Sequence, residues 1–167
     1  MRNLLDEARR GARRLVFVTG EAGIGKSTVV EALAEEARRE GRVWIGTGQC
    51  IEQYGVGEPY LPILEAFGGL CRQPDGRRLI DLLAREAPTW LIQMPGLVEV
   101  ADLHTLQQRV VGSTRARMLR EMSHAISALT ANRPLVLVIE DLHWSDQSTL
   151  DLAGLSRAVA GLLRGCW

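Results

Sequence analysis

The sequence predicts an α/β domain of three layers, with a mostly parallel β-sheet lying between helices. Two continuous apolar runs, at residues 15–19 and 135–139, are typical of strands buried on both faces of a parallel sheet. The first run is followed by turn glycines, a helix-favouring segment at 27–40 and a short second strand at 43–45. Strand, glycine loop, helix and strand in this order form a βαβ unit, and its crossover is expected to be right-handed.

The rest of the chain is predicted to be mostly helical. Residues 2–10 favour a short charged helix, whereas the segment from Gly46 to Pro62 is rich in glycine and polar groups and is expected to be a loop. Further helices are expected at 61–72, 77–87, 105–131 and 148–163. In the last two, apolar residues recur with helical spacing and are predicted to face the core: Met118, Met122, Ile126 and Leu129, then Leu152, Leu155, Val159 and Leu162.

The composition favours one soluble domain that spans residues 1–167. The formal net charge is zero, so the chain lacks the basic surface expected of a domain that binds nucleic acid by itself. The cysteines Cys50, Cys71 and Cys166 are odd in number and widely spaced, which predicts structural thiols in a reducing compartment. No apolar run approaches the roughly 20 residues needed to cross a bilayer, and the charged N-terminus is no secretory signal. We therefore expect a cytoplasmic protein.

A phosphate-binding motif lies between the first strand and the first helix. Residues 20–27 read GEAGIGKS and match the pattern G-x-x-x-x-G-K-[ST] at every fixed position. The glycines allow backbone N–H groups to turn inward as an anion nest, and the helix dipole directs its positive end to the same place. Lys26 is the single lysine among twenty basic residues, and a compact ammonium suits a tightly wrapped phosphate better than a planar guanidinium does.

This motif predicts a nucleotide site, and the competing interpretation is a plain glycine turn. Lys26 is expected to neutralise phosphate charge, Ser27 to place its hydroxyl on Mg²⁺ and Thr28 to add a nearby donor. The predicted nucleotide-binding residues are Gly20, Glu21, Ala22, Gly23, Ile24, Gly25, Lys26, Ser27 and Thr28.

Two carboxylates, Glu140 and Asp141, end the most apolar strand of the chain. The carboxyl end of such a strand lies at the edge of a parallel sheet where ligands bind. One carboxylate can hold Mg²⁺, directly or through water, while its neighbour orients and activates the attacking water. We assign Glu140 to the metal, together with Ser27, and Asp141 to the water; the sequence leaves the order of these two catalytic roles open. The alternative is a strand that simply ends in solvated acids.

Two segments, GEAGIGKST at 20–28 and LVLVIEDLHWSD at 135–146, resemble the AAA-type, origin-recognition-like ATPase domain of large bacterial signal-transduction and transcription regulators. The stretches GQCIEQYGVGEPYLPILEAF and APTWLIQMPGL also look like that family, so the resemblance covers about residues 12–152. It implies an AAA-like P-loop fold, ATP as ligand and Mg²⁺ as cofactor. It also implies a signalling switch that works with other domains or subunits of a larger regulator.

Two departures from the family pattern predict a partial domain, incomplete at both ends. Family members carry an upstream G-R-[DE] box that helps to hold adenine, and this chain starts after the place where it would lie. The tail after Ala153 does not resemble the further strand, sensor residue and helical lid of the family. We therefore expect Mg-ATP binding and leave ATP hydrolysis open. The alternatives are a non-catalytic nucleotide-binding or interaction remnant and a small-molecule kinase, for which we identify no acceptor site.

Other polar residues have both a functional and a structural interpretation. His143 and Trp144 follow the acids, and we expect them to pack the turn between strand and helix. Residues that could line a loop near the nucleotide, or simply lie on the surface, are Gln49, Glu52, Tyr54 and Tyr60. Arginines that could supply an arginine finger, but that fit a solvated helix face better, are Arg115, Arg117 and Arg120.

Overall fold

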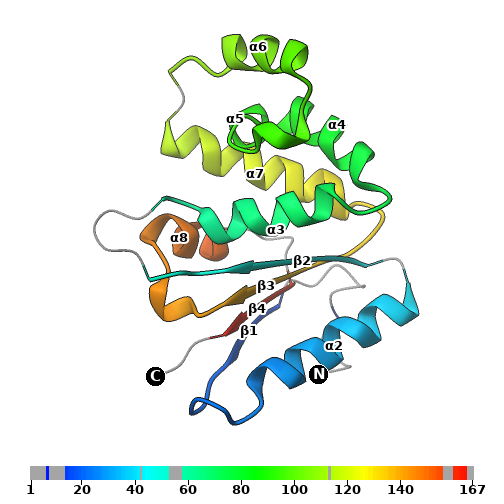
Figure 1. Cartoon of the computed structure of the whole chain (residues 1–167), viewed down its shortest axis with the longest axis vertical. Coiled ribbons are helices and arrows are strands. Elements are labelled where there is room, and N and C mark those ends of the chain that lie inside the picture. Colours follow the sequence, from blue (N-terminus) through cyan, green and yellow to red (C-terminus); the bar gives the residue numbers. More distant parts are fainter. Residues whose placement is uncertain are drawn as a thin grey trace.

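A computed structural model of the chain describes residue 7 and residues 14–41, 43–52, 58–112, 114–155 and 160–164. Its centre is a four-stranded sheet in the order β1-β4-β3-β2, and each pair of neighbouring strands is parallel. The strands are β1 (Leu15–Val18), β2 (Trp44–Gln49), β3 (Leu135–Glu140) and β4 (Ala160–Arg164). Figure 1 shows helices on both sides of this sheet, which confirms the predicted three layers.

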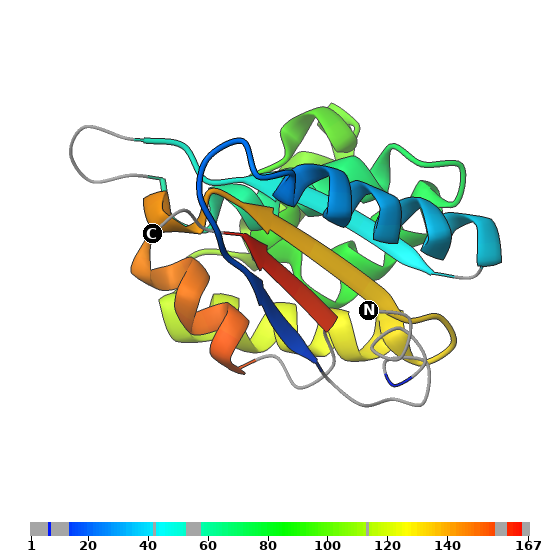
Figure 2. The same ribbon diagram turned by 90° about the horizontal axis from the view of Figure 1, so that it is seen from below.

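Among the described helices, α2 (Lys26–Glu40) is the one that covers the first face of the sheet, as Figure 2 shows from below. Its buried side chains Val30, Leu33, Ala34 and Ala37 pack against apolar side chains of β2 and β3. Because side chains alternate between the two faces of a strand, β3 sends Val136 and Val138 towards α2 and Leu137 and Ile139 to the opposite core. The same alternation places Glu140 on the face of β3 that α2 covers.

The opposite face of the sheet packs on α3 (Leu61–Cys71), close to α8 (Gln147–Leu155). Two glycines of β2 allow α3 to lie against the strand. A Cβ built on Gly48 would lie 1.8 Å from the carbonyl oxygen of Pro62, and one on Gly46 would lie 3.2 Å from that of Ala66. The glycines that predicted a loop after residue 45 therefore serve helix–sheet contact, and β2 extends to Gln49, four residues beyond the prediction.

The close contact between β2 and α3 predicts opposite effects of two glycine variants on the free energy of unfolding. Gly48→Ala is expected to lower the free energy of unfolding by about 3 kcal/mol, since the new methyl group must displace backbone of α3. Gly69→Ala, within α3, meets nothing within 4 Å and is expected to raise the free energy of unfolding by about 0.5–1 kcal/mol. Urea unfolding of both variants checks the contrast, and equal midpoints would contradict it.

Beyond α3 lies a second group of helices, which we call the helical layer: α4 (Gly76–Glu86), α5 (Pro88–Leu91), α6 (Val100–Arg109) and α7 (Arg115–Thr130). The 3₁₀ turn η1 (Pro95–Leu97) joins α5 to α6. Met122, Ile126 and Leu129 of α7 are buried and Met118 packs half-buried beside them, as their spacing predicts. Trp90, fully buried in α5, is central to this layer.

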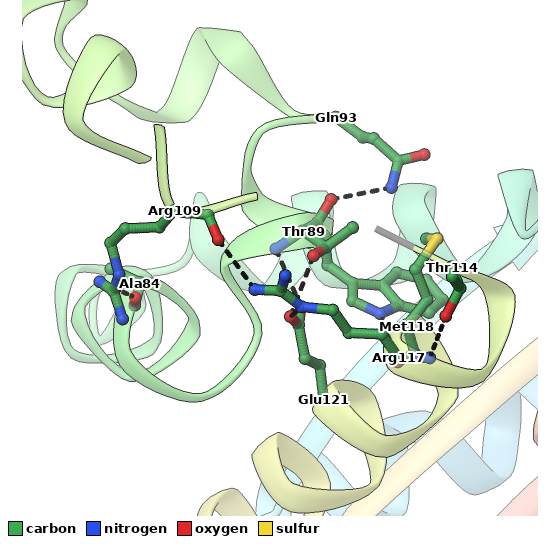
Figure 3. Close-up of polar contacts among 9 residues, drawn as sticks. Ala84, Thr89, Gln93, Arg109, Thr114, Arg117, Met118 and Glu121 are labelled. Carbon is green, nitrogen blue, oxygen red and sulfur yellow. Dashed lines mark hydrogen bonds and ion pairs between the residues drawn. The ribbon is translucent and has the colours of Figure 1, made fainter. Parts of the chain in front are cut away.

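A buried carboxylate fixes α5 to α7 (Figure 3). Glu121 of α7 accepts hydrogen bonds from the backbone N–H of Thr89 and from its hydroxyl, each at 2.9 Å. Arg117 donates to the same carboxylate at 2.8 Å and to the carbonyl oxygen of Arg109 at 3.0 Å. These bonds compensate the burial of Glu121, which is 9% exposed. We call Thr89, Arg117 and Glu121 the α5–α7 latch.

The single helix predicted at 105–131 is wrong, because the segment forms two helices, α6 and α7. Between them Gly112 adopts a left-handed backbone (φ 73°), which ends helical geometry at little cost only for glycine. The hydroxyl of Thr114 then accepts the backbone N–H of Arg117 at 3.3 Å and caps α7.

The helix predicted at 148–163 is also wrong. Helix α8 ends at Leu155, and residues 160–164 form β4, which is hydrogen-bonded on one side to β1 and on the other to β3. Short apolar runs do not distinguish strand from helix by periodicity, and two neighbouring strands override a modest helix propensity. Of the four positions expected to face the core, Leu152 is 2% exposed; the side chains of Leu155, Val159 and Leu162 lie outside the described set. The tail thus contains a strand where the sequence predicted a helix.

Candidate functional site

The loop between β1 and α2 has the backbone that its glycines predict. Gly20, Gly23 and Gly25 have φ values of 149°, 80° and 94°, which side-chain-bearing residues rarely adopt. Gly25 also precedes the first residue of α2, and no side chain caps the helix there. The first-turn N–H groups of a helix have no partner within the helix, so this end of α2 presents free donors together with the positive end of the helix dipole.

Lys26 lies inside this loop with its charge held by the backbone. The side chain is 6% exposed, and Nζ donates to the carbonyl oxygens of Gly20 at 2.7 Å and Glu21 at 2.8 Å. The ammonium therefore links the start of α2 to the first two residues of the loop. Ser27 is half-buried and Thr28 exposed in the first turn of the same helix, while Glu21, Ala22 and Ile24 are exposed.

The acids lie where strand β3 ends, and their backbones differ. Glu140 is the last residue of β3 and is half-buried; by the strand alternation it shares the face of Val136 and Val138, which is the face that α2 covers. Asp141 leaves the strand with a left-handed backbone, φ 53°. Its Oδ2 accepts a hydrogen bond from Nε2 of Gln49 at 3.0 Å.

The strand register brings the loop and the acids to one edge of the sheet. Phe17 of β1 and Ile139 of β3 both pair with Leu163 of β4, so Val18 and Glu140 end level on either side of that strand. Two strand spacings correspond to about 10 Å, a distance that an Mg²⁺–phosphate group spans readily. Figure 1 shows the start of α2 and the segment after β3 at the same end of the sheet.

Two residues of this edge carry more contacts than the sequence indicated. Gln49, considered a loop residue from its sequence, ends β2 opposite Glu140 and contacts Asp141. Asp146 accepts hydrogen bonds from the backbone N–H groups of Tyr60, Ser148 and Thr149. An aspartate immediately before a helix predicts a cap, so one part of the role of Asp146 was accessible from sequence.

Several side chains differ from their expected positions. His143 and Trp144 form the 3₁₀ turn η2 (Leu142–Trp144) but are exposed, so they do not pack the turn as expected. Tyr60 is buried, with its ring centroid 4.8 Å from that of Trp90. Glu52 is exposed, and Tyr54 lies outside the described residues.

The three arginines of α7 also differ from one another. Arg117 belongs to the α5–α7 latch, so a solvated face was the wrong interpretation for it. Arg115 pairs with Asp151 of α8, and Arg120 is exposed.

The two described thiols, Cys50 and Cys71, are free and buried, as expected of structural cysteines. Burial raises the pKa of each to about 11, which keeps both protonated at neutral pH. The backbone N–H of Cys50 donates to the carbonyl of Glu140 at 2.9 Å, which continues the β2–β3 pairing past the strand end.

The described residues contain neither a metal-binding cluster nor a helix that could cross a membrane. No cluster of three or more His, Cys, Asp and Glu side chains suited to a metal ion occurs within the described ranges. Mg²⁺ that arrives with phosphates needs one or two protein ligands and no such cluster. In the same part of the chain no helix has both the length and the apolar character to cross a membrane.

Comparison with known proteins agrees with this architecture. The AAA ATPase domain family matches residues 1–162. An uncharacterized protein of Rhizobium meliloti (strain 1021) is 28% identical over 164 residues, and the match covers 90% of this chain but 15% of that protein. The chain thus spans a small part of the length of this relative. Because the family match extends over far more than half of the sequence, the chain belongs to the AAA ATPase domain family.

Proposed function

We propose that this chain binds Mg-ATP at the edge formed by the loop 20–28 and the end of β3. The observation that carries the proposal is Lys26, a buried ammonium held at the uncapped start of α2 by the carbonyls of Gly20 and Glu21. A cation and free backbone donors directed to one place fit the charge and oxygen acceptors of a triphosphate. Membership of the AAA ATPase domain family supports ATP as the nucleotide.

Each residue of the site would have a distinct role. The backbone of Gly20, Glu21, Ala22, Gly23, Ile24 and Gly25 would surround the phosphates, with Thr28 as a further donor. Lys26 would contact the β- and γ-phosphates, and bound Mg²⁺ would supply charge neutralisation there. Ser27 and Glu140 would hold the metal, and the position of Glu140 on the α2 face favours this assignment. Asp141 would orient and activate water, which makes ATP hydrolysis the proposed reaction.

We further propose that residues 1–167 act as one nucleotide-switch module of a larger cytoplasmic regulator. The small share of the Rhizobium relative that the chain covers supports a modular role. Other domains or subunits would then receive the signal, while the α/β module binds ATP and not nucleic acid, consistent with a net charge of zero.

Equilibrium binding of a fluorescent ATP analogue tests the proposal most directly. We expect saturable binding that is at least about tenfold tighter with Mg²⁺ than with EDTA, since the metal neutralises phosphate charge between Ser27 and Glu140. Unlabelled ATP should displace the analogue. Binding without ATP turnover would favour the non-catalytic alternative, and no binding at all would reject the proposed function.

A further inference from the structure

Asp146 makes more hydrogen bonds than a helix cap requires. Its Oδ1 accepts the backbone N–H groups of Ser148 at 2.8 Å and Thr149 at 3.0 Å, which is the usual cap of the first turn of α8. Its Oδ2 accepts the hydroxyl of Thr149 and, at 3.3 Å, the backbone N–H of Tyr60, 86 positions earlier in the chain. One carboxylate oxygen thus caps α8, and the other reaches the start of α3.

Tyr60 combines two unfavourable features at this contact. It has a left-handed backbone, φ 65°, which is rare for a bulky residue, and its buried hydroxyl has no hydrogen-bond partner. Each feature costs on the order of 1–3 kcal/mol. A residue that is 2% exposed keeps such a conformation only because its surroundings impose it, and the contact with Asp146 is one of those constraints.

Tyr60 in turn contacts the helical layer. Its ring lies against Trp90 with centroids 4.8 Å apart and an interplanar angle of 55°. The indole Nε1 of Trp90 donates to the carbonyl oxygen of Met118 on α7 at 2.8 Å. The neighbouring residue Thr89 belongs to the α5–α7 latch, whose hydrogen bonds Figure 3 shows.

These contacts form a continuous path from the acid segment, residues 141–146, to α5 and α7. A ligand can shift the equilibrium between two arrangements of these contacts only if it binds one arrangement more tightly than the other. Asp141 can give the nucleotide such a preference. Its carboxylate accepts a hydrogen bond from Gln49, and it would exchange this contact for one to water when nucleotide binds. Its left-handed backbone lies five residues before Asp146, within the same short segment.

We propose that Asp146 is a positioning residue that couples the nucleotide site to the helical layer through Tyr60 and Trp90. The proposal rests on the proposed binding of Mg-ATP. Nucleotide at the sheet edge fixes the acid segment, Asp146 transmits its position to Tyr60, and Trp90 then packs more firmly on α7. Conversely, a partner that moves α5 alters the acid segment by the same route, because coupling between two sites is reciprocal.

Hydrogen exchange of the whole chain, followed by mass spectrometry, tests this path with and without Mg²⁺ and a non-hydrolysable ATP analogue. We expect the analogue to slow exchange in residues 20–28 and to slow it about threefold or more in residues 86–94, which contain α5. The first change reports nucleotide binding and the second reports coupling, so the two hypotheses are read separately in one experiment.

Asp146→Asn separates coupling from capping. Asparagine caps a helix as well as aspartate does, but with Oδ1 on the cap its amide nitrogen cannot accept the N–H of Tyr60. We expect residues 20–28 to respond as before and the response of 86–94 to disappear. Asp146→Ser, which also caps a helix but is too short to reach Tyr60, gives the same comparison if the asparagine variant folds poorly. Tyr60→Phe is the matched control: it keeps the backbone donor and the ring, so its response should be retained.

Three outcomes would overturn the proposal. If the analogue slowed hydrogen exchange only in residues 20–28 of the unaltered chain, α5 would not respond to nucleotide binding. An unchanged response at 86–94 in both Asp146 variants would show that the coupling bypasses this residue. Absence of any response at 20–28 would contradict nucleotide binding, and the coupling would fail with it.

Discussion

Lys26→Ala is expected to weaken Mg-ATP binding by about 100-fold or more. The variant removes charge-assisted hydrogen bonds to the phosphates, each of which contributes about 1.5–3 kcal/mol, and it removes the cation from a site that is otherwise built from neutral backbone donors. Titration with a fluorescent ATP analogue measures the loss directly.

The structure predicts that this loss is not caused by unfolding. Alanine frees the carbonyls of Gly20 and Glu21, but Glu21 is exposed and water can replace the lost donor. Removal of a largely buried charge also removes its desolvation cost. The melting temperature of the variant without nucleotide should therefore equal or exceed that of the unaltered chain. A variant that keeps the full ATP affinity would reject the proposed role of Lys26.

Two further variants make the comparison specific. Lys26→Arg keeps the charge, but a planar fork does not reproduce a compact ammonium that bonds two carbonyls inside a tight loop, so at most partial recovery is expected. Arg38→Ala, at the exposed end of the same helix, removes an equal charge far along α2 and should leave the affinity unchanged.

Asp141→Asn is expected to bind ATP normally and to hydrolyse it about 100-fold more slowly, since a positioned general base contributes about 10²–10⁴-fold. The substitution preserves the local structure. Asparagine tolerates the left-handed backbone at φ 53°, and its Oδ1 can still accept the hydrogen bond from Gln49. Steady-state phosphate release should show a lower kcat with little change in KM.

The same variant also tests the order of the acid roles. If Asp141 instead held the metal, Asp141→Asn would raise the Mg²⁺ concentration needed for half-maximal activity, and Glu140→Gln would carry the loss in kcat. Gln49→Ala, which removes the donor but keeps both acids, is expected to lower kcat only several-fold. Turnover that is unchanged in Asp141→Asn would exclude a catalytic role for this carboxylate.

What the sequence predicted correctly depends on short-range chemistry. The glycines of residues 20–25 permit a positive-φ backbone at little cost, so the turns of the loop between β1 and α2 could be predicted from its own residues. The apolar strand before Glu140 is similarly local. Both acids and the loop were expected at one sheet edge, and the register of β1, β4 and β3 agrees.

The errors arose where distant residues decide the local structure. Residues 160–164 are a strand because β1 and β3 supply hydrogen bonds on both sides. Gly48 is a strand residue because α3 must lie against it. The contact between Asp146 and Tyr60 joins two segments that no pattern in the sequence connects. In each case the determining partner lies more than ten residues away, beyond the reach of periodicity or capping signals.

The central place of β4 in the sheet has a consequence for how the protein folds. Among the described strands β1 pairs only with β4, and Val18 meets Arg164 across most of the chain. Such non-local pairing has a high entropic cost of loop closure, and this cost slows folding. During synthesis β2 and β3 can associate first, but β1 gains its native hydrogen bonds only after β4 has emerged from the ribosome. The strand that leads into the phosphate loop is therefore among the last to join the sheet, although it is the first of the described strands along the chain.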